Sequence, residues 1–233
     1  MQTDEAFRPG RRQVLAAGAA MLAMPAFVRA RAASAHVVVV GGGFGGATAA
    51  RYLRQLAPEV KVTLVEPATR FYTCPFSNLY LGGLRTFESI GHGYDGLRAD
   101  GVEVVHARAE DVDATARTVR LSNGRTLKWD RLVLSPGIDF RWDALPGYDE
   151  AASWVAPHSW KAGKQTQLLY KQLRAMPDGG TFVMVIPDLP YRCPPGPYER
   201  ACMVAHYFKQ NKPRSKILLL DAKDNFSKKA LFQ

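Results

Sequence analysis

The fold is decided by the stretch His36-Val-Val-Val-Val40-Gly41-Gly42-Gly43-Phe44-Gly45-Gly46, which passes from a run of valines directly into a run of glycines. Consecutive β-branched residues are typical of a parallel strand that is buried on both faces. Gly41, Gly43 and Gly46 occupy the positions of the dinucleotide-binding pattern G-x-G-x-x-G. In that pattern the first glycine permits a tight turn, the second lets the backbone approach a diphosphate, and the third lets a helix lie close to the strand.

The residues after the glycines continue the pattern of a nucleotide-binding unit. The Ala- and Leu-rich segment 47–57 predicts a helix, which Pro58 ends. Residues 60–65 predict a second strand, and Glu66 follows it at the spacing where an acidic residue accepts hydrogen bonds from ribose hydroxyls. The helix N-terminus is expected to face the diphosphate. We therefore expect cofactor contacts from Gly41, Gly43, Phe44, Gly45, Gly46 and Glu66.

Short strand-like runs between residues 102 and 134 favour FAD over NAD as the dinucleotide. These runs cover residues 102–106, 118–121, 126–129 and 132–134. Asn123-Gly124 separates the middle two and is a hairpin turn signal. An antiparallel insertion before a return to the main sheet is typical of the FAD domains of disulfide reductases. The return strand, residues 131–134, ends in Ser135-Pro136-Gly137, a turn that we expect to pass the cofactor again.

The first 35 residues have the features of an export signal. Arg11-Arg12 precede the apolar stretch 14–28, and small residues spaced for signal-peptidase cleavage continue to Ala35. Because twin arginines before a weakly hydrophobic core resemble a twin-arginine signal, we expect a periplasmic protein exported already folded. An uncleaved membrane anchor and a disordered tail are the alternatives. No other stretch is a transmembrane candidate, so no membrane span is expected.

The composition narrows the classes of ligand and partner. The chain has 233 residues, 47% of them hydrophobic, and a net charge of +10. No Lys- and Arg-rich run is interleaved with aromatic residues, so we expect a scattered basic surface and no nucleic-acid partner. The histidines have no metal-ligand spacing, so no metal site is expected. Neither C-x-x-C nor C-x-x-C-H occurs among the 3 cysteines, so the chain does not attach a c-type haem itself.

Several segments between residues 71 and 201 resemble one particular flavoprotein family. They are Phe71-Tyr72-Thr73-Cys74-Pro75-Phe76-Ser77-Asn78, Gly82-Gly83, Glu88-Ser89-Ile90, residues 92–98, residues 160–166 and Tyr191-Arg192-Cys193-Pro194-Pro195-Gly196-Pro197-Tyr198-Glu199-Arg200-Ala201. The chain resembles the flavoprotein subunit of flavocytochrome c sulfide dehydrogenase, and more distantly the sulfide:quinone oxidoreductases, within the FAD-dependent pyridine nucleotide-disulfide oxidoreductases. This resemblance implies an oxidoreductase that oxidises hydrosulfide through a cysteine disulfide and FAD, and that passes the electrons to a c-type cytochrome subunit.

The resemblance implies a covalent cofactor at Cys74. In that family the cysteine matching Cys74 carries FAD through a thioether to the flavin 8α-methyl group. Cys74 lies a few residues past the second predicted strand, on the loop that leaves the cofactor edge of the sheet. A tether would prevent loss of the flavin outside the cell, where no pool replaces it. A buried, idle thiol is the alternative.

Cys193 matches the family's redox-active cysteine. Residues 181–186 predict the first strand of a second nucleotide-binding-like domain, and residues 198–208 predict a helix. Where that domain would carry its own glycine loop, the sequence has Cys193-Pro-Pro-Gly-Pro197, whose prolines lack N–H donors for a diphosphate. A thiolate just before a helix N-terminus is stabilised, and Arg192 and Arg200 are nearby cations. A structural loop with a buried thiol is the alternative.

The chain departs from the family at its C-terminal side. In the family the partner of the redox-active cysteine lies past the position of residue 233, so we expect a C-terminally truncated chain that does not complete the disulfide. Cys202 is expected to be a small core residue of the helix and no substitute for that partner.

The sequence predicts an α/β protein with three parts. Residues 1–35 are the twin-arginine signal peptide, residues 36–142 are a three-layer Rossmann-like FAD-binding domain with an antiparallel insertion, and residues 143–233 are an incomplete second Rossmann-like domain. Two other functions remain open. One is an NAD(P)H-dependent flavin disulfide reductase, against which the proline-rich loop counts, and the other is an inactive, truncated flavin-binding remnant.

Overall fold

The computed structural model describes residues 34–158 and 160–232. The predicted twin-arginine signal, with Arg11-Arg12, therefore lies outside the described residues except for its last two positions. In the part that is described, no helix is both long and apolar enough to cross a membrane.

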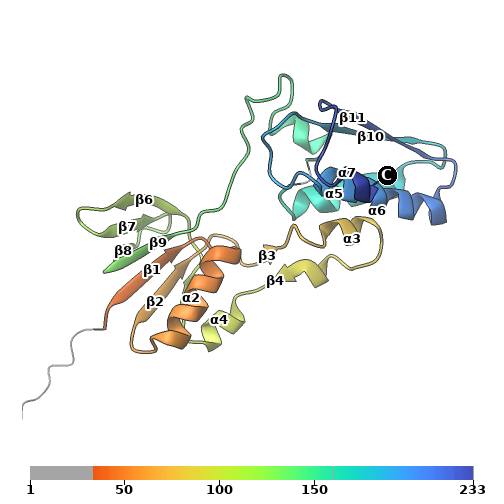
Figure 1. Cartoon of the computed structure of the whole chain (residues 1–233). Helices are drawn as coiled ribbons and strands as arrows, with labels where there is room; N and C mark the ends of the chain where they lie inside the picture. The colour runs from red at the N-terminus through yellow and green to blue at the C-terminus, as the bar shows by residue number, and fades with distance from the viewer. Residues whose placement is uncertain (1–33, 159, 233) are drawn as a thin grey trace, which may run out of the picture. The chain divides into compact units, whose positions relative to one another are not determined.

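The valine run forms the centre of a four-stranded parallel sheet (Figure 1). Strand β1, His36–Val40, pairs with β2, Lys61–Val65, on one side and with β9, Arg131–Leu134, on the other. Strand β5, Glu103–Val105, adds to the far edge of β2, which gives the order β5-β2-β1-β9. The strands predicted at residues 36–40, 60–65 and 131–134 are confirmed.

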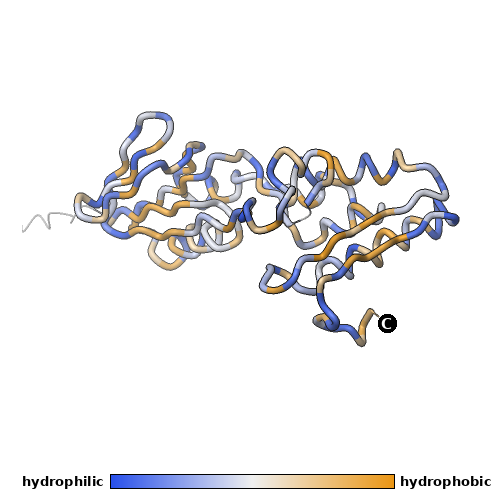
Figure 2. Tube along the Cα trace, turned by 90° about the horizontal axis from the view of Figure 1, so that it is seen from above, coloured by the Kyte–Doolittle hydropathy of each residue, from blue (hydrophilic) through white to orange (hydrophobic). Residues whose placement is uncertain are grey.

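Alternate valines of β1 pack into two different layers, because successive side chains of a strand point to opposite faces. Val37 and Val39 pack with residues of helices α2, Phe44–Leu56, and α4, Asp95–Ala99. Val38 packs on the other face, against a small antiparallel sheet. The three-layer arrangement of helices, parallel sheet and antiparallel sheet is thus present, and hydrophobic residues follow the strands in Figure 2.

The antiparallel layer contains three strands in the order β6-β7-β8. They are β6, Ala109–Asp113, β7, Thr118–Leu121, and β8, Thr126–Lys128. The predicted turn at Asn123-Gly124 joins β7 to β8, and Gly124 has φ +81°, a left-handed conformation that suits glycine. Val119, Leu121 and Leu127 of this layer are buried against the parallel sheet.

The structure differs from the sequence-based expectation at two strands. Residues 102–106 were grouped with the antiparallel insertion, but β5 belongs to the main sheet and runs parallel to β2. Strand β6 has no counterpart among the predicted strands. Its sequence Ala109-Glu-Asp-Val-Asp113 is rich in acidic residues that rarely favour strands, and only its pairing with β7 makes it one.

Residues 66–102 leave the main sheet before β5 returns to it. This excursion contains β3, Phe71–Tyr72, α3, Ser77–Leu81, the 3₁₀ turn η1, Glu88–Ile90, and β4, Gly91–His92, which pairs with β3. Tyr80, Leu81, Phe87 and Ile90 of the excursion form a core with Leu169 of helix α5, Lys164–Ala175. The loop that carries Cys74 is therefore fixed by the later part of the chain.

The later part of the chain contains a βαβ unit. Strands β10, Thr181–Ile186, and β11, Lys216–Asp221, are parallel, and helix α6, Gly196–Asn211, connects them. The short elements η2, Ala152–Trp154, and α7, Lys229–Phe232, flank this unit in the sequence. Helix α6 begins two residues before the prediction because proline, here Pro197, fits the first turn of a helix. The proposed domain boundary near residue 143 stays a prediction.

Candidate functional site

Two positions of the glycine loop, Gly41 and Gly46, have no room for any side chain. Gly41 has φ +99°, and a Cβ atom there would lie 2.0 Å from the carbonyl oxygen of Ser135. A Cβ atom on Gly46 would lie 1.8 Å from the carbonyl oxygen of Gly41. Both positions are closed by backbone atoms, so any side chain would force the turn apart. The backbone of Gly41 therefore lies very close both to the first turn of α2 and to the turn after β9.

The second glycine of the motif, Gly43, is less closely packed. A Cβ atom on Gly43 would meet only the ring of Phe71, at 3.5 Å, which is ordinary contact. Helix α2 begins directly after Gly43, and no side chain caps its N-terminus. The first N–H groups of a helix carry a partial positive charge and bind anions well. The open face at Gly43 therefore fits a cofactor diphosphate.

Glu66 lies beside the same loop, at the end of β2. Its Oε2 accepts a hydrogen bond from the N–H of Gly42 at 2.7 Å, and its Oε1 accepts one from the N–H of Ala68 at 2.8 Å. These bonds fix the carboxylate against the turn. Each carboxylate oxygen has a second lone pair, so Glu66 can still accept hydrogen bonds from ribose hydroxyls.

Tyr94 is a site residue that the sequence analysis missed. Its hydroxyl donates a 3.1 Å hydrogen bond to the carbonyl oxygen of Gly42, and the side chain is buried. Burial, together with the nearby Glu66 carboxylate, raises the pKa of Tyr94 to about 12. The phenol therefore stays protonated and keeps donating to the loop. No local spacing connects Tyr94 to the glycines, so no sequence signal was available.

The turn after β9 lies against the glycine loop. The N–H of Ser135 donates to the carbonyl oxygen of Val40 at 2.8 Å, and its Oγ lies 2.7 Å from where a Cβ atom on Gly45 would be. Pro136 and Gly137 follow in the same turn and are exposed. Phe44 is also exposed, with its ring edge-to-face on Phe71 at 5.2 Å. The structure thus brings Gly41–Gly46, Glu66 and Ser135 together.

Cys74 lies after β3, at the start of α3. Its carbonyl oxygen accepts a hydrogen bond from the N–H of Ser77 at 3.0 Å, and its side chain is half-buried and free of any disulfide. Phe76, two residues on, has φ +70° and is exposed. Burial raises the pKa of the Cys74 thiol, and the charge of Arg200 acts in the opposite direction.

Cys193 lies in the loop just before α6, with φ +59° and an exposed side chain. Its carbonyl oxygen accepts the N–H of Gly196 at 2.9 Å. A Cβ atom on Gly196 would lie 3.2 Å from the Cys193 sulfur and 3.2 Å from the ring of Trp160. The sulfur is therefore held over the first turn of the helix.

The two cations predicted near Cys193 differ in burial. Arg192 is exposed, whereas Arg200 is 5% exposed on α6. The prediction that Cys202 is a core residue is wrong, because its side chain is exposed. Two residues along a helix correspond to about 200° of rotation, which turns Cys202 away from the face that buries Arg200.

The acidic residue at the end of β11, in the βαβ unit around α6, has partners within the protein. In such units an acidic residue at the end of the second strand binds the ribose. Here that residue is Asp221, and its carboxylate accepts hydrogen bonds from the Tyr198 hydroxyl and from Nζ of Lys223. The Tyr198 ring stacks on Phe226 with centroids 3.7 Å apart. The Asp221 carboxylate is thus engaged by Tyr198 and Lys223.

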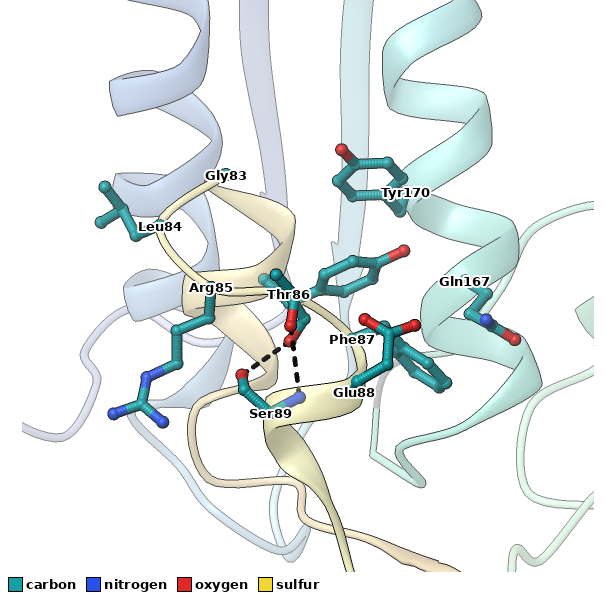
Figure 3. A pocket seen from close by; sticks show the side chains of 10 residues that line it. Gly83, Leu84, Arg85, Thr86, Phe87, Glu88, Ser89, Gln167 and Tyr170 are labelled. Atoms are coloured by element: carbon teal, nitrogen blue, oxygen red, sulfur yellow. Dashed lines mark hydrogen bonds between the residues drawn. The ribbon is translucent and has the colours of Figure 1, made fainter.

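A hollow of about 650 Å³ lies away from all these residues (Figure 3). The loop Gly83–Ser89 lines it together with Tyr80, and with Gln167 and Tyr170 of α5. The loop is stiffened by hydrogen bonds between Thr86 and Ser89 of 2.7 and 3.3 Å. No predicted site residue lines this hollow.

Comparisons with known proteins point to one family. Residues 35–172 match the family described as pyridine nucleotide-disulphide oxidoreductase, and residues 166–233 match the sulfide dehydrogenase (flavocytochrome c) flavoprotein chain, central. The chain is 74% identical over 43 residues to the sulfide dehydrogenase (flavocytochrome c) flavoprotein chain of Chlorobaculum thiosulfatiphilum, which is 18% of this chain and 90% of that sequence.

A second group of relatives extends over more of the chain. The sulfide-quinone reductase of Aquifex aeolicus is 33% identical over 186 residues, which is 78% of this chain and 41% of that protein. The crystal structure of the sulfide:quinone oxidoreductase from the same bacterium has a TM-score of 0.67 at 27% identity, covering 82% of this chain and 44% of that one. The chain thus spans about two fifths of the length of these curated relatives.

Proposed function

The chain belongs to the pyridine nucleotide-disulphide oxidoreductase family, on the branch of the sulfide dehydrogenase flavoprotein chains, and from this premise we propose that it is an FAD-dependent sulfide dehydrogenase flavoprotein. Hydrosulfide is the proposed electron donor, and a c-type cytochrome subunit is the proposed acceptor. The observation that carries the proposal is the packing of two segments around the buried Arg200. Its Nε is bonded to Asn78 on the short helix that follows Cys74, and the Cys193 sulfur lies over the first turn of the helix that carries Arg200.

The residues of the glycine loop fit the proposed cofactor. The open face at Gly43 and the uncapped N-terminus of α2 would hold the diphosphate of FAD, and Glu66 would bind the ribose. The turn Ser135-Pro136-Gly137 would pass the cofactor on its other side. FAD, when bound, supplies an acceptor of two electrons that can release them one at a time.

The proposed role of Cys193 is to form one half of the disulfide that reacts with sulfide. Hydrosulfide attacks one sulfur of that disulfide, so a new S–S bond forms to the substrate while the other sulfur leaves as a thiolate. The exposed Cys193 side chain is accessible to a small anion. Its position before α6 places it in the positive field of a helix N-terminus, which favours an approaching anion.

Cys74 is the proposed covalent attachment point of the flavin. It is half-buried on the segment that leaves the sheet after β2, three residues past Phe71, whose ring lies edge-to-face on Phe44 of the glycine loop. We also propose that the protein works in the periplasm, because residues 1–35 resemble a twin-arginine export signal. A tether suits that location, where a lost flavin is not replaced.

Two observations count against the alternative of an NAD(P)H-dependent flavin disulfide reductase. The loop before α6 has prolines at 194, 195 and 197, which cannot donate backbone hydrogen bonds to a diphosphate. The acidic residue expected to bind the NAD ribose, Asp221, differs from Glu66 in that its carboxylate forms an ion pair with Lys223, in addition to accepting the Tyr198 hydroxyl.

Anaerobic reduction of the flavin tests the proposed donor. Sulfide added to the oxidised holoprotein should bleach the flavin absorbance, and NADH at the same concentration should not. Cys193→Ser should keep its bound flavin and lose the bleaching by sulfide. Bleaching by NADH would favour the reductase, and no bleaching by either donor would favour an inactive flavin-binding remnant.

A further inference from the structure

Arg200 is a buried cation to which the proposed reaction assigns no role. It is 5% exposed on α6, and its Nε donates a 2.9 Å hydrogen bond to Oδ1 of Asn78 on α3. A buried guanidinium has lost its hydration, so it is kept only where the protein supplies compensating partners or uses the charge. Helices α3 and α6 pack against each other at this point.

The segments that carry both predicted reactive cysteines meet at the part of α6 that holds Arg200. Gly196 and Arg200 are four residues apart on α6 and so share one face of the helix. The Cys193 sulfur lies over that face, 3.2 Å from the Cβ position of Gly196. Cys74 precedes the same short helix that carries Asn78, and its carbonyl oxygen is bonded to the first N–H of that helix.

The charges around Cys74 oppose one another. Burial raises the pKa of its thiol most strongly, Arg200 lowers it, and Cys193 and Glu199 raise it further. Burial also lowers the pKa of Arg200 to about 10, so the guanidinium remains charged near neutral pH. His158 lies in the field of Arg200 too, and burial lowers its pKa to about 4, so it brings no second positive charge there.

We propose that Arg200 is a positioning residue whose buried positive charge stabilises the deprotonated Cys74 sulfur. In this step the S–H bond of Cys74 breaks and the proton passes to water. The thiolate is the reactive form of a cysteine, so Arg200 offsets part of the reactivity that burial removes from the thiol proposed to carry the flavin. The inference rests on the proposed function, which makes Cys74 the attachment point.

Alkylation of the flavin-free 233-residue chain tests the proposal. A short pulse of iodoacetamide at a series of pH values, followed by peptide mapping, measures the rate at each cysteine separately. Arg200→Gln should slow alkylation of Cys74 roughly tenfold at pH 8 and move its pH profile upward. Arg200→Lys should restore most of the rate. The exposed Cys202 is the internal reference, and Arg214→Met, which removes an exposed cation, is the matched control.

Arg200→Gln could destabilise the folded chain, so a second variant tests the same charge effect from an exposed position. Glu199 is exposed and disfavours the Cys74 thiolate, so Glu199→Gln should speed alkylation of Cys74 and move its profile downward. An unchanged profile in both variants overturns the proposal. So does faster alkylation in Arg200→Gln at every pH, because that is the mark of local opening and of a merely structural arginine.

A separate experiment tests whether the flavin is attached to the chain. Wild-type holoprotein precipitated in acid should retain its flavin on the polypeptide. If it does not, the attachment at Cys74 is wrong, and the alkylation profiles still decide whether Arg200 stabilises the thiolate.

Discussion

The place that a Cβ atom would take on Gly46 lies 1.8 Å from the carbonyl oxygen of Gly41. The first turn of α2 therefore lies so close to the end of β1 that there is no room for a methyl group on Gly46. Because the obstructing atom belongs to the backbone, no side-chain rotation can relieve the overlap. The close approach of helix and strand is what aims the helix N-terminus at the open face beside Gly43.

Gly46→Ala is therefore expected to displace α2 from the loop and to lower flavin occupancy several-fold. Flavin bound per chain, measured by absorbance after gel filtration, checks this. Gly96→Ala is the matched control, since Gly96 lies in α4 and a Cβ atom there meets nothing within 4 Å. Equal flavin occupancy in the two variants would show that the Gly41–Gly46 contact does not shape the cofactor site.

Tyr94 should make the stability of the protein depend on alkaline pH. Its pKa is raised from 10.0 to about 12 in the folded chain, so the unfolded chain loses this proton first. Its contribution is fully present below pH 10 and is lost as the pH rises through 12. The loss amounts to about 1–3 kcal/mol of the free energy of unfolding.

Tyr94→Phe removes both this pH dependence and the hydrogen bond to Gly42. We expect it to lower the free energy of unfolding at pH 8 by about 1 kcal/mol. Between pH 10 and 12 its stability should fall less steeply than that of the wild type. Urea titrations at pH 8, 10, 11 and 12 measure both effects, and parallel curves for the two proteins would contradict the assignment.

Cys74→Ser tests the proposed tether directly. Serine preserves the size and polarity of the side chain but cannot form a thioether, so the variant should bind FAD and release it on acid denaturation. Yellow colour and fluorescence in the supernatant, rather than in the pellet, report this. Cys202→Ser, at an exposed thiol, should retain the flavin as the wild type does. Flavin that stays on the Cys74→Ser polypeptide would place the attachment elsewhere.

The sequence predicts the parts of the fold that depend on local pattern. The valine run, the glycines and the strand before α6 are visible in it, because periodicity and turn chemistry act over a few residues. Strand β6 is not visible, since its acidic residues form a strand only through pairing with β7. The sequence also does not show which distant residues come into contact. Tyr94 contacts Gly42 from 52 residues away, and Asn78 contacts Arg200 from 122 residues away.

Cys202 shows why helix membership alone does not decide burial. Cysteine is among the most buried residue types, which makes a core position the natural expectation. The face of α6 that turns inward is set instead by Arg200, Val204, Tyr207 and Phe208, and Cys202 lies off it. A mixed face with a buried arginine has a weak amphipathic pattern, so the sequence does not reveal which side packs.

Lys212 should contribute to stability far more than its position at the end of α6 suggests. It is 6% exposed, and its Nζ donates hydrogen bonds to the carbonyl oxygens of Leu173 at 2.9 Å, Arg174 at 2.7 Å and Met176. These carbonyls end helix α5, where backbone acceptors lack partners and a positive charge is favoured.

Lys212→Met keeps the length of the side chain and removes the donor and the charge. Three carbonyl oxygens then lose their partner in a buried place, so we expect the free energy of unfolding to fall by about 2–4 kcal/mol. Lys209→Met removes an exposed lysine from the same helix and should change it by less than about 0.5 kcal/mol. Urea unfolding of both variants measures the difference. If the two variants unfold alike, then Lys212 does not hold the end of α5, and the packing of Leu173 and Tyr207 must do so alone.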